Sequence, residues 1–173
     1  TLDGFELASR LSYFLWSTMP DDELFQAAQS GALDTKEGLE AQVDRMLAHP
    51  KATAIVENFG GQWLTTRALE RATPDPRVFP EWDDELRQAM SMETQLVFAE
   101  IIDQNRSLLD LLDAEFTWVN ERLARHYGIE GIEGETFQRV DAPENRGGVL
   151  THGSFLTFSS NPTRTSPVKR GVW

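Results

Sequence analysis

The longest periodic segment of the chain reads, from residue 82 to residue 104, WDDELRQAMSMETQLVFAEIIDQ. Its apolar residues Leu86, Met90, Val97 and Ile101 recur at the spacing of one helix face. We therefore expect a single long helix with these side chains facing inward. The remainder of the fold is expected to pack around that buried face.

Shorter helical segments surround the long helix. Asp34 with Glu37 three residues later is typical of a capping box, and Asn120 with Gly128 brackets another helix. The predicted helices, including the long one, span about 7–15, 21–30, 34–48, 52–63, 82–104, 107–112 and 120–127. The sequence thus predicts an all-α fold, an irregular multi-helix bundle of about seven helices with short connections.

The pattern changes after Gly128, and the C-terminal segment is expected to be partly irregular. Residues 137–140 favour a short strand, residues 147–158 fit helix and strand equally, and Ser166-Pro167 begins a further helix. We expect a helical domain at 1–136 and the truncated start of a second domain at 137–173, packed on the first. Because the sequence starts at Thr1 and stops soon after a helix start, we expect a piece of a longer polypeptide.

The composition excludes several functions. The formal net charge of −12 disfavours nucleic acid as a partner, and the absence of any run of 18 apolar residues predicts no membrane insertion. The sequence has no cysteine, so it offers no thiolate metal site and no covalent attachment point for haem c. We therefore expect no cofactor in this chain.

Motifs for catalysis and metal binding are scarce. His49, His126 and His152 lie outside the His-Glu-x-x-His and Glu-x-x-His patterns, so no metal site is predicted. Residues 151–154 place a serine near His152, but a general base must approach its nucleophile across space, and we interpret this stretch as a turn or cap. The sequence predicts no catalytic residue.

The charge is unevenly distributed along the chain. Residues 1–138 carry 11 basic and 26 acidic side chains, whereas residues 139–173 carry five basic and two acidic side chains. The helix that begins at Ser166 offers free backbone N–H groups to an anion such as a phosphate, a substrate carboxylate or a haem propionate. The anion-binding candidates are Arg146, His152, Arg164, Ser166, Lys169 and Arg170.

The alternative role of these bases is to hold the C-terminal segment on the acidic body, and this is the role that we expect. Glu93 and Glu100 lie seven residues apart, close to the apolar stripe of the long helix. A buried carboxylate pair can act as an acid/base pair or hold a metal. Carboxylates are rarely buried without a partner, so we expect Glu93 and Glu100 to be structural partners of the basic segment.

Several blocks of sequence resemble a known pair of families. They read SRLSYFLWS (9–17), MPDDEL (19–24), NF (58–59), QWL (62–64), VNE (119–121), LA (123–124), HYG (126–128), RGGVLT (146–151) and RTSPVKRG (164–171). The chain resembles the paired domains of unknown function of large planctomycete, verrucomicrobial and myxobacterial proteins, which are named for their association with c-type cytochromes. The first family corresponds to about Asp3–Thr136, and the second begins near Arg146.

The resemblance implies an exported multidomain protein, periplasmic or extracellular, in which haem c belongs to another domain. The partners it implies are other domains of the same polypeptide, including cytochrome c modules, and it supplies no catalytic residues. We expect a non-catalytic helical scaffold or interaction module that orients neighbouring domains. The alternative is a part of an oxidoreductase with an anion or haem-propionate site at the basic segment, whose candidate residues would converge on one cavity.

Overall fold

The computed structural model describes residues 2–173, of which 59% are helical. The prediction of a mostly helical protein is confirmed, but a pure all-α bundle of seven helices is wrong. The described residues form about ten helices and two small antiparallel sheets of two strands each. The chain divides into two compact units, Thr1–Phe59 and Gly60–Trp173.

The first unit consists of helices joined by tight turns. Its elements are α1 (Gly4–Leu15), α2 (Asp22–Gln29), η1 (Ala32–Asp34), α3 (Lys36–Leu47), η2 (Pro50–Ala52) and the π-helical η3 (Ile55–Gly60), the last of which runs to the unit boundary. Asp3 and Glu6 form a capping box on α1, and Asp21 caps α2. The start predicted for α3 is shifted by one residue, because Thr35 and not Asp34 accepts the capping hydrogen bond.

Trp16, at the end of α1, holds this unit together. Its side chain is buried, and its indole N–H donates a 2.9 Å hydrogen bond to the carbonyl oxygen of Met46 on α3. The guanidinium of Arg45 lies over the indole ring and forms a fork with the carboxylate of Asp21. These contacts join the ends of α1, α2 and α3.

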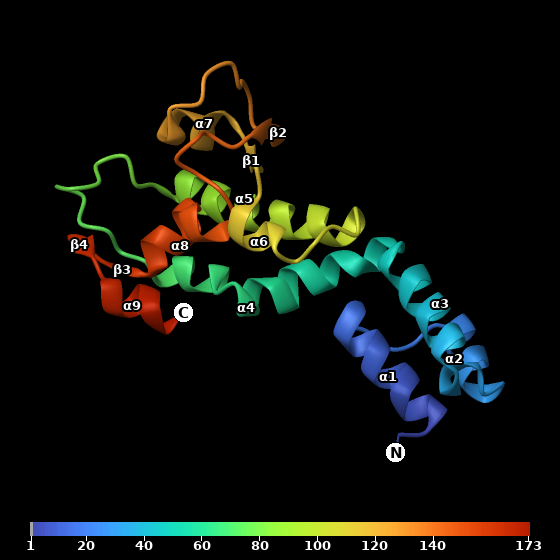
Figure 1. Ribbon diagram of the computed structural model, residues 1–173. Helices are drawn as coiled ribbons and strands as arrows, with labels where there is room; N and C mark the ends of the chain where they lie inside the picture. Colours follow the sequence, from blue (N-terminus) through green and yellow to red (C-terminus); the bar gives the residue numbers. More distant parts are fainter. Residues whose placement is uncertain (1) are drawn as a thin grey trace. The chain divides into compact units, whose positions relative to one another are not determined.

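The second unit is built on α5 (Asp84–Asp103), the predicted long helix, which Asp83 caps. Leu86, Met90, Val97 and Ile101 are buried as predicted. In Figure 1, α7 (Glu121–Tyr127), β1 (Phe116–Val119) and β2 (Gln138–Asp141) lie on one side of α5, and α8 (Gly153–Phe158) lies on the other. The remaining elements before the C-terminal segment are α4 (Gly61–Trp63), η4 (Thr66–Arg71) and α6 (Asp110–Asp113).

The helix predicted at 52–63 is instead divided among η2, η3 and α4. Gly60, within the predicted helix, lies where a Cβ atom would come within 2.7 Å of the Phe98 ring. Only glycine therefore lets the backbone approach α5 so closely.

The two sheets correct the all-α expectation. The strand predicted at 137–140 forms as β2 and pairs antiparallel with β1, with Thr117 opposite Val140. A second hairpin, β3 (Ser160–Asn161) with β4 (Arg164–Thr165), turns at Pro162 and Thr163. The strands of the second hairpin have two residues each, which is too short to display a strand period in the sequence.

The C-terminal segment continues through η5 (Val149–Thr151) and α8 to α9 (Pro167–Val172). Ser166 caps α9 as predicted, accepting a hydrogen bond from the backbone N–H of Lys169. Trp173 packs edge-on against Phe155 of α8 and donates a hydrogen bond to the hydroxyl of Thr65. Residues 137–173 thus lie within the second unit.

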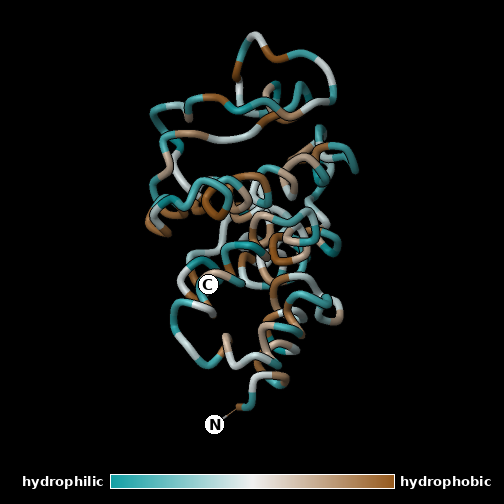
Figure 2. The backbone as a smooth tube through the Cα atoms, turned by 90° about the vertical axis from the view of Figure 1, so that its right-hand side faces the viewer, coloured by the Kyte–Doolittle hydropathy of each residue, from teal (hydrophilic) through white to brown (hydrophobic). Residues whose placement is uncertain are grey.

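Hydrophobic and hydrophilic residues alternate along the helices in Figure 2, as expected of amphipathic helices with one buried face. Among residues 2–173, no helix combines the length and the apolar character needed to cross a bilayer.

Candidate functional site

A buried carboxylate lies at the centre of the second unit. Glu93 of α5 is only 1% exposed, and each of its oxygens accepts a hydrogen bond from a hydroxyl group. Thr117 of β1 donates to Oε1 at 2.7 Å, and Tyr127 of α7 donates to Oε2 at 2.6 Å. The interior position of Glu93 is therefore satisfied by two neutral donors.

His152 extends this network toward α8. Its ring is 3% exposed, and Nδ1 lies 2.9 Å from the hydroxyl of Thr94, which in turn lies 2.7 Å from the hydroxyl of Ser154. Nε2 lies 4.0 Å from Oε1 of Glu93. Burial lowers the pKa of His152 below its ordinary value of 6.5, against the opposing effect of the Glu93 charge.

Tyr127 joins this network to the surface. Its hydroxyl also accepts a 2.7 Å hydrogen bond from the backbone N–H of Gly153. Burial, followed by the charge of Glu93, raises the pKa of Tyr127 well above 10.0. The guanidinium of Arg146 lies 3.5 Å from the centre of the Tyr127 ring and donates a hydrogen bond to the carbonyl oxygen of Thr151.

The ring of Tyr127 also lines a cavity of about 430 Å³, which is within the size range of small-molecule sites. The polar lining includes three guanidinium groups, from Arg146, Arg164 and Arg170. The apolar lining includes Phe79, Trp82, Leu86, Met90 and Leu156. The cavity, which we call the arginine cavity, therefore combines an apolar wall with positive charge.

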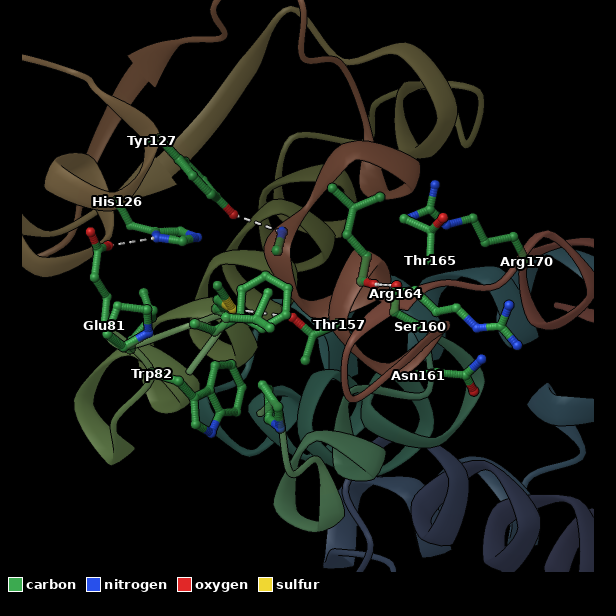
Figure 3. A pocket seen from close by; sticks show the side chains of 18 of the residues that line it. Glu81, Trp82, His126, Tyr127, Thr157, Ser160, Asn161, Arg164, Thr165 and Arg170 are labelled. Carbon is green, nitrogen blue, oxygen red and sulfur yellow. Dashed lines mark hydrogen bonds and ion pairs between the residues drawn. The ribbon is translucent and has the colours of Figure 1, made fainter. Parts of the chain in front are cut away.

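Figure 3 shows two sides of the arginine cavity. Glu81, Trp82, His126 and Tyr127 lie on one side, and Asn161, Arg164, Thr165 and Arg170 lie on the other. The imidazole of His126 is oriented by Glu81, since its Nδ1 lies 3.4 Å from the carboxylate oxygen. The two rings of Trp82 and His126 thus face the basic side across the cavity.

One backbone hydrogen bond connects the two sides. The loop that precedes α5 carries Phe79 and Trp82, and the N–H of Asp75 in that loop donates a 2.9 Å hydrogen bond to the carbonyl oxygen of Pro162. Pro162 lies in the turn of the β3–β4 hairpin, which carries Arg164. This bond brings the apolar loop against the basic hairpin.

The structure brings only part of the predicted anion site together. Arg146, Arg164 and Arg170 line the arginine cavity, whereas His152 is enclosed behind it in the Glu93 network. Ser166 caps α9, and the amine of Lys169 donates a hydrogen bond to the carbonyl oxygen of Ser160.

The two predicted acidic partners have different surroundings. Glu93 accepts hydrogen bonds from hydroxyl groups, with His152 as its neighbour from the basic segment. The carboxylate of Glu100 accepts a 3.0 Å hydrogen bond from the guanidinium of Arg139 and a 2.9 Å hydrogen bond from the indole N–H of Trp118. Among residues 2–173, no carboxylate forms an ion pair with any of the cavity arginines or with Lys169.

Sequence reasoning missed the opposite side of the cavity, namely Glu81, Trp82, His126 and Tyr127. A signal existed for Tyr127, which lies one turn after the buried Leu123 and whose inward-facing phenol needs a hydrogen-bond partner. In the described part of the chain, no group of three or more histidine, aspartate or glutamate residues is placed to hold a metal ion.

Comparison with known proteins identifies the family of the chain. No curated protein and no solved structure matches it. The model of one family, described as PSD4, protein of unknown function (DUF1592), matches residues 2–129. The match includes Glu93 and Tyr127 and ends before Arg146. Because it covers most of the 173 residues, the chain belongs to the PSD4 family of proteins of unknown function.

Proposed function

We propose that residues 60–173 bind a small organic anion in the arginine cavity and that the chain acts as a non-catalytic module of a larger protein. One observation carries this proposal. Arg146, Arg164 and Arg170 line a single cavity, and none of them forms an ion pair with a carboxylate of residues 2–173.

The absence of these ion pairs is informative because carboxylates are abundant. The chain has 28 acidic side chains against 16 basic ones, and other arginines, such as Arg45 and Arg139, do pair with them. An arginine that only held the C-terminal segment in place would be expected to use one of these carboxylates. Arginines that line a cavity without forming an ion pair instead favour an anionic ligand.

The titratable groups at the cavity support binding without turnover. The raised pKa of Tyr127 keeps its phenol protonated at neutral pH, so it does not serve as a base there. His152 is enclosed in the core with Nδ1 next to Thr94. His126 also lines the cavity, where its ring contacts the carboxylate of Glu81, and we assign both side chains to holding a ligand.

The wider setting that we propose is an exported bacterial protein with cytochrome c modules, and it rests on the sequence blocks described above. The residues of this chain do not fit a haem c of its own, because the sequence has no cysteine and His152 is buried among Thr94 and Glu93. If the larger protein is an oxidoreductase, we propose that the anion bound in the arginine cavity is a haem propionate from another domain.

Thermal unfolding of the whole chain tests the proposal. At constant ionic strength, butyrate should raise the melting temperature of the unmodified chain, the parent of the variants below, because a ligand that binds only the folded state stabilises it. The double variant Arg164→Gln/Arg170→Gln should lose this shift. Arg125→Gln removes an exposed arginine that lies outside the cavity and should retain it. Equal shifts in all three proteins, or no shift in the parent, would overturn the proposal.

A further inference from the structure

We infer that the ligand of the arginine cavity is a monocarboxylate with a flat apolar body. The inference rests on the proposed function and adds to it the chemical class of the ligand and its orientation. The carboxylate lies at Arg170, and the apolar body lies against Trp82 and Phe79.

The apolar side of the cavity requires an apolar body. Leu86 and Met90 form its buried part, and Trp82 is half-buried. At the rim, Val78 and Phe79 leave 50% and 45% of their surface exposed, so this apolar surface is available for a ligand to cover. A bare phosphate or acetate would leave it in water and gain nothing from it.

The aromatic lining favours a flat body over a branched chain. Phe79, Trp82 and Tyr127 all contribute ring surface to the same cavity. Rings that meet a planar ligand in stacked or edge-on geometry contribute attraction beyond the area they bury. The hydrogen bond from Asp75 to Pro162 holds the loop that carries two of these rings.

The opposite side supplies the anchor for the carboxylate. Arg170 is half-buried on α9, and its Nε is enclosed without a hydrogen-bond acceptor in the described part of the chain. No carboxylate among residues 2–173 forms an ion pair with this arginine. The planar guanidinium group of Arg170 matches the two oxygens of a carboxylate, and the exposed Arg164 of β4 adds a second positive charge to the same cavity.

The charges around the cavity favour a single negative charge on the ligand. Glu81 places a carboxylate on the side opposite Arg164, and the whole chain carries a net charge of −12. A second negative charge on the ligand would be repelled by both. Phosphate sites commonly offer free backbone N–H groups, whereas the N–H of Gly153 is already donated to Tyr127.

Isothermal titration calorimetry with the whole chain tests the inference, using four probes. They are 3-phenylpropanoate, its neutral amide, acetate and inorganic phosphate. The phenyl acid should bind at least about tenfold more tightly than acetate, which lacks the body, and than the amide, which lacks the charge. Phosphate should bind more weakly than the phenyl acid.

Three variants locate the two ends of the ligand. Arg170→Gln should weaken binding of the phenyl acid by about tenfold and leave the amide unchanged. Phe79→Ser, at the exposed rim, should weaken the acid and the amide by the same factor. Arg125→Gln is the charge control and should behave as the parent, and a thermal melt of each variant establishes that it is folded.

The outcomes separate the inference from the proposed function. If phosphate binds as tightly as the phenyl acid and Arg170→Gln weakens both, the anion site stands and the ligand class is overturned. If acetate matches the phenyl acid, the apolar body is likewise overturned while the anion site stands. If none of the anions binds, or if the amide binds as tightly as the acid, both the inference and the proposed function fail.

Discussion

The hydroxyl of Tyr127 lies 2.6 Å from Oε2 of Glu93 and donates a hydrogen bond to it in the interior of the second unit. The same hydroxyl accepts a hydrogen bond from the N–H of Gly153, so α5, α7 and α8 meet at one oxygen atom. The ring that this oxygen belongs to lines the arginine cavity. The hydrogen bonds of the buried hydroxyl therefore hold the Tyr127 ring in place in the cavity wall.

Replacing this hydroxyl should destabilise the protein. In Tyr127→Phe, the carboxylate of Glu93 loses a donor and the N–H of Gly153 loses an acceptor, and both groups are buried. We expect the free energy of unfolding to fall by about 1–3 kcal/mol, the cost of leaving buried polar groups without partners. Urea unfolding followed by far-ultraviolet circular dichroism measures this change.

Tyr13→Phe is the matched control, since Tyr13 is 61% exposed on α1. Removal of its hydroxyl should change the free energy of unfolding by less than about 0.5 kcal/mol. Equal losses in the two variants would show that the hydrogen bonds of Tyr127 contribute nothing specific.

The stability of the protein should depend on pH through Tyr127 and His152. The pKa of Tyr127 is raised in the folded state, so its contribution is complete below 10.0 and is lost as the pH rises above that value. The pKa of His152 is lowered, so its contribution is complete above 6.5 and is lost as the pH falls below it. Urea titrations across this range should show a plateau of stability between pH 6.5 and pH 10.0.

Two variants assign the two limits of this plateau. Tyr127→Phe should have a lower plateau but a smaller decline above pH 10.0, because its ring does not ionise. His152→Gln should show a smaller decline just below pH 6.5. If both variants follow the parent profile in parallel, other groups cause the pH dependence.

The helices with local signals were predictable from the sequence. The apolar spacing of α5 and its cap at Asp83, and the Asn120 cap and Gly128 terminus of α7, all lie within or next to the helix itself. The strand β1 has no such signal. Its residue Thr117 is extended because it pairs with Val140, and a pairing across more than 20 residues is not visible in a local pattern.

The candidate site was predictable only as a set of charges. The sequence indicates that Arg146, Arg164 and Arg170 belong to a basic segment, but their convergence depends on tertiary structure. The loop that carries Trp82 lies beside the hairpin that carries Arg164 because the backbone N–H of Asp75 donates a hydrogen bond to the carbonyl oxygen of Pro162. A hydrogen bond between two backbone groups depends on no particular side chain, so residue types alone do not reveal it.

In the first unit, Asp21→Ala should destabilise the start of α2. Its side chain accepts the capping hydrogen bond from Leu24 and holds both terminal nitrogens of Arg45. Loss of the cap alone costs about 0.5–2 kcal/mol, measured as a fall in thermal stability at pH 7. The hydrogen bond from Arg45 lowers the pKa of Asp21, so the difference between variant and parent should be complete above pH 3.8 and shrink as the pH falls below it.

The neighbouring variant Asp22→Ala is the control. Asp22 is exposed in the first turn of α2, where it contributes only its charge near the helix dipole. Its loss should cost at most about 1 kcal/mol and less than that of Asp21. A cost equal to that of Asp21→Ala would contradict the assigned roles of the cap and the Arg45 contact.

Gly148 should tolerate no side chain. It follows Arg146 and Gly147 at a φ of +63°, a conformation that residues with a Cβ atom rarely adopt. A Cβ atom at this position would overlap the backbone carbonyl group of Leu112, which has no rotamer by which to move away. Because the strain and the overlap add, Gly148→Ala should lower the free energy of unfolding by about 3 kcal/mol or more.

Gly171→Ala distinguishes this effect from a general intolerance of glycine replacement. Gly171 lies in α9, and no atom lies within 4 Å of the position of its Cβ. Alanine is the better helix former, so this variant should be neutral or gain up to about 1 kcal/mol. Chemical unfolding of both variants tests the pair. If Gly171→Ala lowers the free energy of unfolding as much as Gly148→Ala does, the role of Leu112 is contradicted. Of these two positions, Gly148 alone has a backbone group within contact distance of the added atom.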